Sequence, residues 1–288
     1  MKAIDRFLSN QKNLIFVFIA IAVFAALQSY FGSLKTFEGG TILYTRYNNY
    51  VIFKQSFFHL IQNKDLYILH PQEQWDLFKY SPAFALFFAP LAYLPDALGL
   101  TLWSILNALT LVYAVYYLPN MDMRTKGLVL IFTLSETLLS IQNEQSNALI
   151  AGLLIFSFGF LERKKYWLAS LCIVSTIFIK LFGIVGLALY LLYRNKLKLT
   201  YTTGFWIILF TFIPLIVVDW NQFILLYKSW GNMLSNDHSI SDGLSVIGWL
   251  KTWFGLELNK SYVSVAGALL FCLTLTRIKA YQQYEYRI

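Results

Sequence analysis

A lysine inside an apolar stretch is the first residue whose position suggests chemistry. Lys180 lies between Ile177–Ile179 and Leu181–Phe182, with no acidic residue near it in the sequence. An ammonium group at the centre of a membrane helix costs at least about 2.5–3.5 kcal/mol, so it usually has a partner or a task. One interpretation is that the side chain extends to lipid headgroups. We favour the other, in which Lys180 binds a phosphate group in the outer leaflet.

A polar stretch between two apolar runs is the second candidate. It runs from Ser140 to Asn147, and an ordinary loop of this kind would more often contain Gly, Pro or Asp. Amides both donate and accept hydrogen bonds, so a cluster of amides suits a ligand rich in hydroxyl groups. The stretch therefore predicts substrate-binding roles for Gln142, Asn143, Gln145 and Asn147.

Scattered carboxylates are the candidates for acid/base chemistry. The sequence contains no HExxH, CxxC, GxSxG or Gly-rich phosphate motif, and no DxD motif for a metal-bound sugar donor. We therefore expect neither a metal nor another cofactor, and carboxylate chemistry is the natural choice. The predicted catalytic bases are Asp76, Glu38 and Glu144, and Asp65 is the next candidate after these three. His238, in a polar part of a loop, either orients an acceptor or is simply solvated.

The composition describes an integral membrane protein. Hydrophobic residues make up 58% of the chain and charged residues 13%, whereas a soluble domain has about 45–50% and about 25%. So small a share of charged residues cannot provide the polar surface that a soluble protein needs to cover its core. The net charge of +8 is explained by basic loops that orient membrane helices, so we expect no nucleic-acid partner. Cys172 and Cys272 lie in apolar runs and suggest packing rather than a metal or a disulfide.

Nine apolar runs are the candidate helices of an all-α, polytopic transmembrane bundle. Several are shorter than the span of about 20 residues that a membrane requires, which predicts short or broken helices. The run at 82–94 contains Pro90, and we expect a re-entrant or half-crossing element there. The runs are Leu14–Tyr30, Pro82–Leu94, Leu98–Leu118, Leu128–Ser140, Ala148–Leu161, Trp167–Ile179, Phe182–Tyr193, Phe205–Val218 and Val263–Thr276.

Basic clusters between the runs predict the orientation in the plasma (inner) membrane, because Lys and Arg favour the cytoplasmic side. The segments 31–80, 141–147 and 219–261 then face outward. Within the first, Tyr50–Leu60 has the spacing of an amphipathic helix on the outer interface. The run 167–193 predicts two short helices with Lys180 at their outer tip. We expect one domain, 1–288. The clusters lie near Lys2, Arg124, Arg163, Arg194 and Arg277.

Four motifs in the same order resemble glycosyltransferase family 87. The first, Tyr80-Ser81-Pro82 with Pro90–Pro95, Trp103 and Asn107, is similar to the family's "YPP…PLA.LP…W…N" stretch. Gln142-Asn143 through Asn147 resembles its "GQ.N" region, and Phe178–Phe182 resembles "IKLFP". The segments Asn48–Lys54 and Asp76–Pro82 are similar to the version of Bacteroidetes-type bacteria, and the resemblance covers about Tyr47 to Leu250.

The resemblance implies a C-type glycosyltransferase fold and a polyprenyl-phosphate-linked sugar donor, usually of mannose or arabinose. It implies a catalytic Asp in the first outer loop, where this sequence has Asn48-Asn49 instead. It also implies membrane helices beyond Ile288, so we expect a C-terminally truncated chain.

We therefore predict transfer of a sugar from that donor to an extracytoplasmic glycan or glycolipid acceptor. Cationic side chains would stabilise the departing phosphate in place of a metal. The alternative is a non-enzymatic membrane protein, such as a lipid-linked sugar transporter or an inactive transferase partner. A transporter would often show internal repeats, which are absent here. Further predicted substrate-binding residues are Asn48, Asn49, Lys54, Lys79 and Tyr80.

Overall fold

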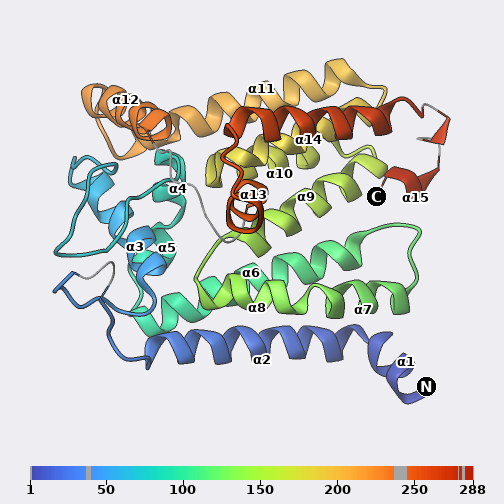
Figure 1. Ribbon diagram of the computed structural model, residues 1–288, viewed down its shortest axis with the longest axis horizontal. Coiled ribbons are helices and arrows are strands. Elements are labelled where there is room, and N and C mark those ends of the chain that lie inside the picture. The colour runs from blue at the N-terminus through green and yellow to red at the C-terminus, as the bar shows by residue number, and fades with distance from the viewer. Residues whose placement is uncertain (1, 37–39, 237–244, 278, 281–282, 288) are drawn as a thin grey trace. The chain divides into compact units, whose positions relative to one another are not determined.

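The computed structural model describes all residues except 1, 37–39, 237–244, 278, 281–282 and 288 (Figure 1). The chain divides into two compact units, Met1–Gly231 and Asn232–Ile288. Helices make up 74% of the residues, and the described part of the chain contains no strand. The predicted all-α class is confirmed. Glu38 and His238 lie outside the described residues.

Within the described residues, three helices are long and apolar enough to cross a membrane. They are α2 (Gln11–Tyr30), α6 (Asp96–Tyr117), and α11 (Lys196–Phe212) with its short continuation η2 (Ile213–Ile216). Helices α2 and α6 lie side by side in Figure 1. Their fully buried leucine, alanine, valine and phenylalanine side chains form one core cluster, which includes Phe18, Ala22 and Val112.

Shorter helices complete the first unit, as the short apolar runs predict. These are α7 (Met123–Phe132), α8 (Leu134–Gln142), α9 (Asn147–Glu162), α10 (Tyr166–Ile179) and η1 (Leu181–Leu192). The last is a 3₁₀ helix, whose rise of about 2.0 Å per residue makes it longer than an α-helix of the same sequence length. The start of η1 lies very close to α10. A Cβ atom added at Gly183 would lie 2.5 Å from the backbone of Thr176.

The two ends of the first unit differ in character. One end, which we call the polar end, carries the loop 31–80, the turn 142–147 and the start of α12 (Trp220–Asn236). The opposite end, the basic end, carries α1 (Lys2–Leu8) and the loops that contain the basic clusters near Arg124, Arg163 and Arg194, as Figure 1 shows. The polar end also holds α3 (Asn48–Ile61), α4 (Pro82–Phe87) and α5 (Ala89–Ala92).

The run at 82–94 forms α4 and α5, which have six and four residues. At about 1.5 Å per residue neither can cross a membrane, and the re-entrant or half-crossing element stays a prediction. The predicted amphipathic helix exists as α3, but most of its apolar face is buried against α4 and α5. The Phe53 ring, for example, lies 4.8 Å from Tyr80 and 5.3 Å from Phe84 between ring centroids.

The second unit contains α13 (Val246–Phe254), α14 (Lys260–Leu275) and α15 (Tyr284–Arg287). Helix α13 begins at a Ser245 side chain that accepts from the Gly248 amide at 3.0 Å. It ends at Gly255, whose φ of 64° is the left-handed conformation that a glycine adopts at low cost.

Candidate functional site at the polar end

Lys180 lies where α10 ends and η1 begins, in extended backbone (φ −137°, ψ 128°). Its Nζ atom donates to Gln145 Oε1 at 2.7 Å and to Asn147 Oδ1 at 3.0 Å. These acceptors, from a segment more than 30 residues away, are neutral amides. The ammonium group is therefore held in place, while its charge is not neutralised by an ion pair with any of the described residues.

Two aromatic rings also lie near the ammonium group of Lys180. Its Nζ atom lies 5.7 Å from the ring centroid of Tyr80 and 5.8 Å from that of Phe182, within the range of cation–π interactions. Tyr80 belongs to the long loop that precedes α4, and Tyr67 donates to its carbonyl at 2.9 Å. The next residue, Ser81, donates to the Phe178 carbonyl at 2.6 Å. These bonds fix the loop against the end of α10.

The polar stretch of the sequence forms the turn 142–147 between α8 and α9. Two backbone bonds end α8: the Glu144 amide donates to Ile141 O, and the Gln145 amide donates to Ser140 O. This is the pattern of a Schellman motif, in which Glu144 is the left-handed residue, with φ 50°. The turn positions Gln145 and Asn147 for their bonds to Lys180.

Three other helices hold the turn 142–147. Gln28 at the end of α2 accepts from Gln142 at 2.9 Å, and the Trp103 indole of α6 donates to the Glu144 carbonyl at 2.9 Å. The Asn49 amide of α3 donates to the Asn143 carbonyl at 2.8 Å. The structure therefore brings Asn49 to the turn, and the turn to Lys180.

The two predicted bases within the described residues, Asp76 and Glu144, have different surroundings. Asp76 is exposed, with 52% of its side chain accessible, and its carboxylate lies 3.8 Å from Lys79 Nζ. Glu144 is only 2% exposed, and its Oε1 atom has no hydrogen-bond partner. Burial raises the pKa of Glu144 from 4.5 to about 8, while Ser29 and Lys35 lower it by smaller amounts.

Two predicted binding residues are engaged within the fold. Asn48 is buried and accepts from the Trp75 amide at 3.0 Å. Lys54 forms an ion pair with Asp96 at 2.6 Å and donates to Leu94 O at 3.2 Å. These bonds join α3 to the start of α6. Sequence analysis missed Asp96, although its place in the first turn of a helix is typical of an acidic residue.

A histidine pair in the same loop was also missed. His59 is buried, its Nε2 atom lies 2.7 Å from a Glu73 carboxylate oxygen, and its ring centroid lies 4.0 Å from that of His70. Burial, followed by the charge of His70, lowers the pKa of His59. No group of three or more His, Cys, Asp or Glu residues in the described ranges could hold a metal ion.

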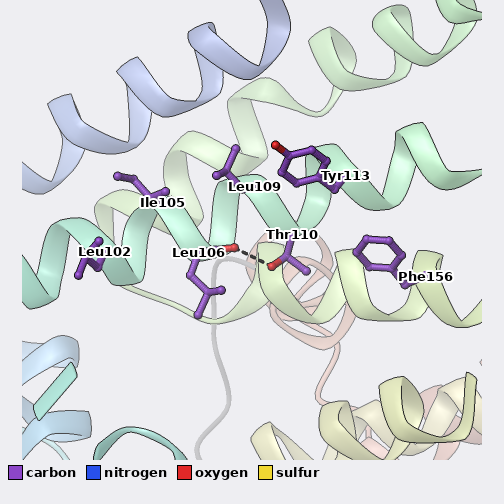
Figure 2. Close-up of a pocket in the computed structure, with 7 residues that line it drawn as sticks. All are labelled: Leu102, Ile105, Leu106, Leu109, Thr110, Tyr113 and Phe156. Atoms are coloured by element: carbon purple, nitrogen blue, oxygen red, sulfur yellow. Dashed lines mark hydrogen bonds between the residues drawn. The ribbon is translucent and has the colours of Figure 1, made fainter. Parts of the chain in front are cut away.

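A separate groove lies along α6 and α9. Figure 2 shows that it is lined mostly by apolar side chains, together with the hydroxyl-bearing Thr110 and Tyr113; the Thr110 hydroxyl group donates to Leu106 O at 2.7 Å within α6. None of the predicted site residues lines it. The groove offers little hydrogen bonding to a polar ligand, so the polar end remains the candidate site. Its lining residues are Leu102, Ile105, Leu106, Leu109, Thr110, Tyr113 and Phe156.

Three helices long and apolar enough to cross a membrane, with a cation held by amides at one end of the first unit, are typical of a polytopic membrane protein. Residues 78–287 match the model of glycosyltransferase family 87, and the chain belongs to this family. It is therefore a membrane glycosyltransferase, not the non-enzymatic protein that we considered as an alternative. No curated protein and no solved structure shows significant similarity to the chain.

Proposed function

We propose that the protein transfers a sugar, of the mannose or arabinose class, from a polyprenyl-phosphate donor to the hydroxyl group of a glycan or glycolipid. The observation that carries this proposal is the position of Lys180. It is a cation that breaks an apolar hairpin, held by two amides and flanked by two aromatic rings. A lipid donor needs this arrangement, because its tail lies among apolar helices while its phosphate lies near the interface.

The residues around Lys180 suit both parts of the donor head. The ammonium group forms charge-assisted hydrogen bonds with a phosphate, and it stabilises the negative charge that develops as the phosphate departs. Gln145 and Asn147 can each donate and accept, as sugar hydroxyl groups require. Aromatic rings such as Tyr80 add an apolar surface beside the site.

The polar end then faces the outside of the plasma membrane, in the cell envelope. The support is the charge distribution: basic clusters occupy the loops at the opposite end, and such clusters favour the cytoplasm. Of the remaining predicted residues, Asn49, Gln142 and Asn143 lie on the same turn or against it. Asp76 and Lys79 lie on the loop that leads to Tyr80. This placement supports a role for them along the path of the acceptor.

The test is a transfer assay with the purified chain in lipid nanodiscs. Polyprenyl-phosphate mannose and polyprenyl-phosphate arabinose, each radiolabelled in the sugar, are offered with a glycolipid extract as acceptor. We expect release of polyprenyl phosphate and label in the extract with at least one donor. Transfer from a nucleotide sugar, and from neither lipid donor, would reject the proposal.

A further inference from the structure

Four residues other than glycine adopt a left-handed backbone conformation in the described part of the chain: Asn63, Asn120, Glu144 and Lys164. At Asn63 and Lys164 the same pair of backbone bonds ends a helix as at Glu144. Glycine or asparagine is usual at this position, because a side chain adds strain there. The side chains of Asn63, Asn120 and Lys164 are exposed, whereas that of Glu144 is buried.

Glu144 therefore carries two costs, of which the other three turns share only the first. Its backbone is strained, and one buried carboxyl oxygen has no hydrogen-bond partner. A buried polar atom without a partner costs about 1–3 kcal/mol. A fold tolerates such costs mainly where the residue has a function. A hydroxyl group of a bound ligand would supply the hydrogen bond that Oε1 lacks.

We propose that Glu144 is the general base that takes the proton from the acceptor hydroxyl group. This inference rests on the proposed function. The acceptor O–H proton moves to the Glu144 carboxylate as the acceptor oxygen forms a bond to the anomeric carbon. The bond from that carbon to the phosphate oxygen breaks, and the phosphate departs with the electron pair, held by Lys180.

The neighbours of Glu144 support this role. Asn143, whose side chain is exposed, precedes it, and Gln145, which binds Lys180, follows it. Glu144 is therefore adjacent in the sequence to the partner of the proposed phosphate ligand and to an exposed residue. Burial raises its pKa to about 8, against the smaller opposing effects of Ser29 and Lys35. A base is most effective when its pKa lies near the working pH.

The experiment compares Glu144→Gln with the wild type in the nanodisc assay, with polyprenyl-phosphate mannose and arabinose as donors. A general base contributes about 10²–10⁴-fold, so we expect a loss of that size in transfer rate. Donor affinity and the unfolding temperature should not fall, because the amide has the same shape. In the wild type the rate should rise with pH and level off near pH 8. Glu144→Asp, which keeps a carboxylate, should retain part of the rate and of this pH dependence.

Two matched controls separate catalysis from the strain of the turn. Lys164→Gly and Asn63→Gly change the equivalent residue of the other two turns and should leave the transfer rate unchanged. Wild-type transfer by Glu144→Gln would overturn the proposal. So would a variant that loses donor binding and thermal stability together with activity, since that shows a structural role. If the wild type neither binds nor uses either lipid donor, the proposed function itself fails.

Discussion

Two cations at opposite ends of the first unit, Lys180 and Arg124, are held in different ways. At the basic end, Arg124 forms an ion pair with Asp5 at 2.7 Å, and both side chains are largely exposed. At the polar end, Lys180 is half-buried and bonded to amides. A cation kept from water without a counterion is costly unless a ligand supplies the charge. This difference between Lys180 and Arg124 supports the proposal that Lys180 binds an anion.

The strongest test of this difference is topological. In a variant without Cys172 and Cys272, single cysteines are introduced by Asn143→Cys and Lys164→Cys. We expect the first to react with an impermeant thiol reagent on intact cells, and the second to react only after permeabilisation. Labelling of both from the same side would contradict the assignment of the two ends.

Removal of the Lys180 charge should weaken donor binding. A hydrogen bond to a charged group contributes about 1.5–3 kcal/mol, so Lys180→Met should raise the dissociation constant for a polyprenyl-phosphate sugar by about 10- to 150-fold. Isothermal titration in nanodiscs measures this change. The exposed Lys164 at the basic end provides the control, since Lys164→Met should bind as the wild type does. Equal affinity of all three proteins would mean that Lys180 only reaches lipid headgroups.

The buried carboxyl group of Glu144 should make stability depend on pH. Its pKa rises from 4.5 to about 8 on folding, so the folded protein retains a proton that the unfolded chain releases. Its contribution to stability should therefore fall as pH rises from about 4.5 to about 8, and then remain constant. Thermal unfolding of the wild type and of Glu144→Gln across this range measures the effect. The same slope in both proteins would show that Glu144 is not its source.

The two ion pairs provide the smallest contrast. The Lys54–Asp96 pair is 20% and 34% exposed at its side chains, whereas the Arg124–Asp5 pair is 58% and 42% exposed. We expect Lys54→Met to reduce the free energy of unfolding by about 1–3 kcal/mol, and Arg124→Met by less than about 1 kcal/mol. Denaturation in detergent measures both. If Lys54→Met instead leaves stability unchanged and weakens donor binding, Lys54 belongs to the binding site.

Much of the site could be predicted from the sequence, because polar residues inside apolar runs are conspicuous. Lys180 and the amides at 142–147 were identified in this way, and so was the break between α10 and η1. The two short helices α4 and α5 also follow from local rules, since Pro90 lies inside the run and Pro82 and Pro95 bound it.

The remaining contacts depend on tertiary structure. Asp96 lies 42 residues from Lys54, and nothing in the local sequence pairs them. The burial of Glu144 follows from the left-handed turn and from the packing of α2 and α6 around it. The apolar face of α3 is covered by α4 and α5, which come from a later part of the chain. The local sequence of α3 therefore does not reveal that this face is buried.

The central claim is that a lipid phosphate binds beside Lys180, and photo-crosslinking tests it most directly. A polyprenyl-phosphate sugar with a diazirine next to the phosphate is irradiated with the protein in nanodiscs, and the modified peptides are identified by mass spectrometry. We predict labels on Tyr80, on Phe182 and within the turn 142–147, with labelling lost in Lys180→Met. Labels confined to the basic end, around Arg163 and Lys164, would contradict the claim.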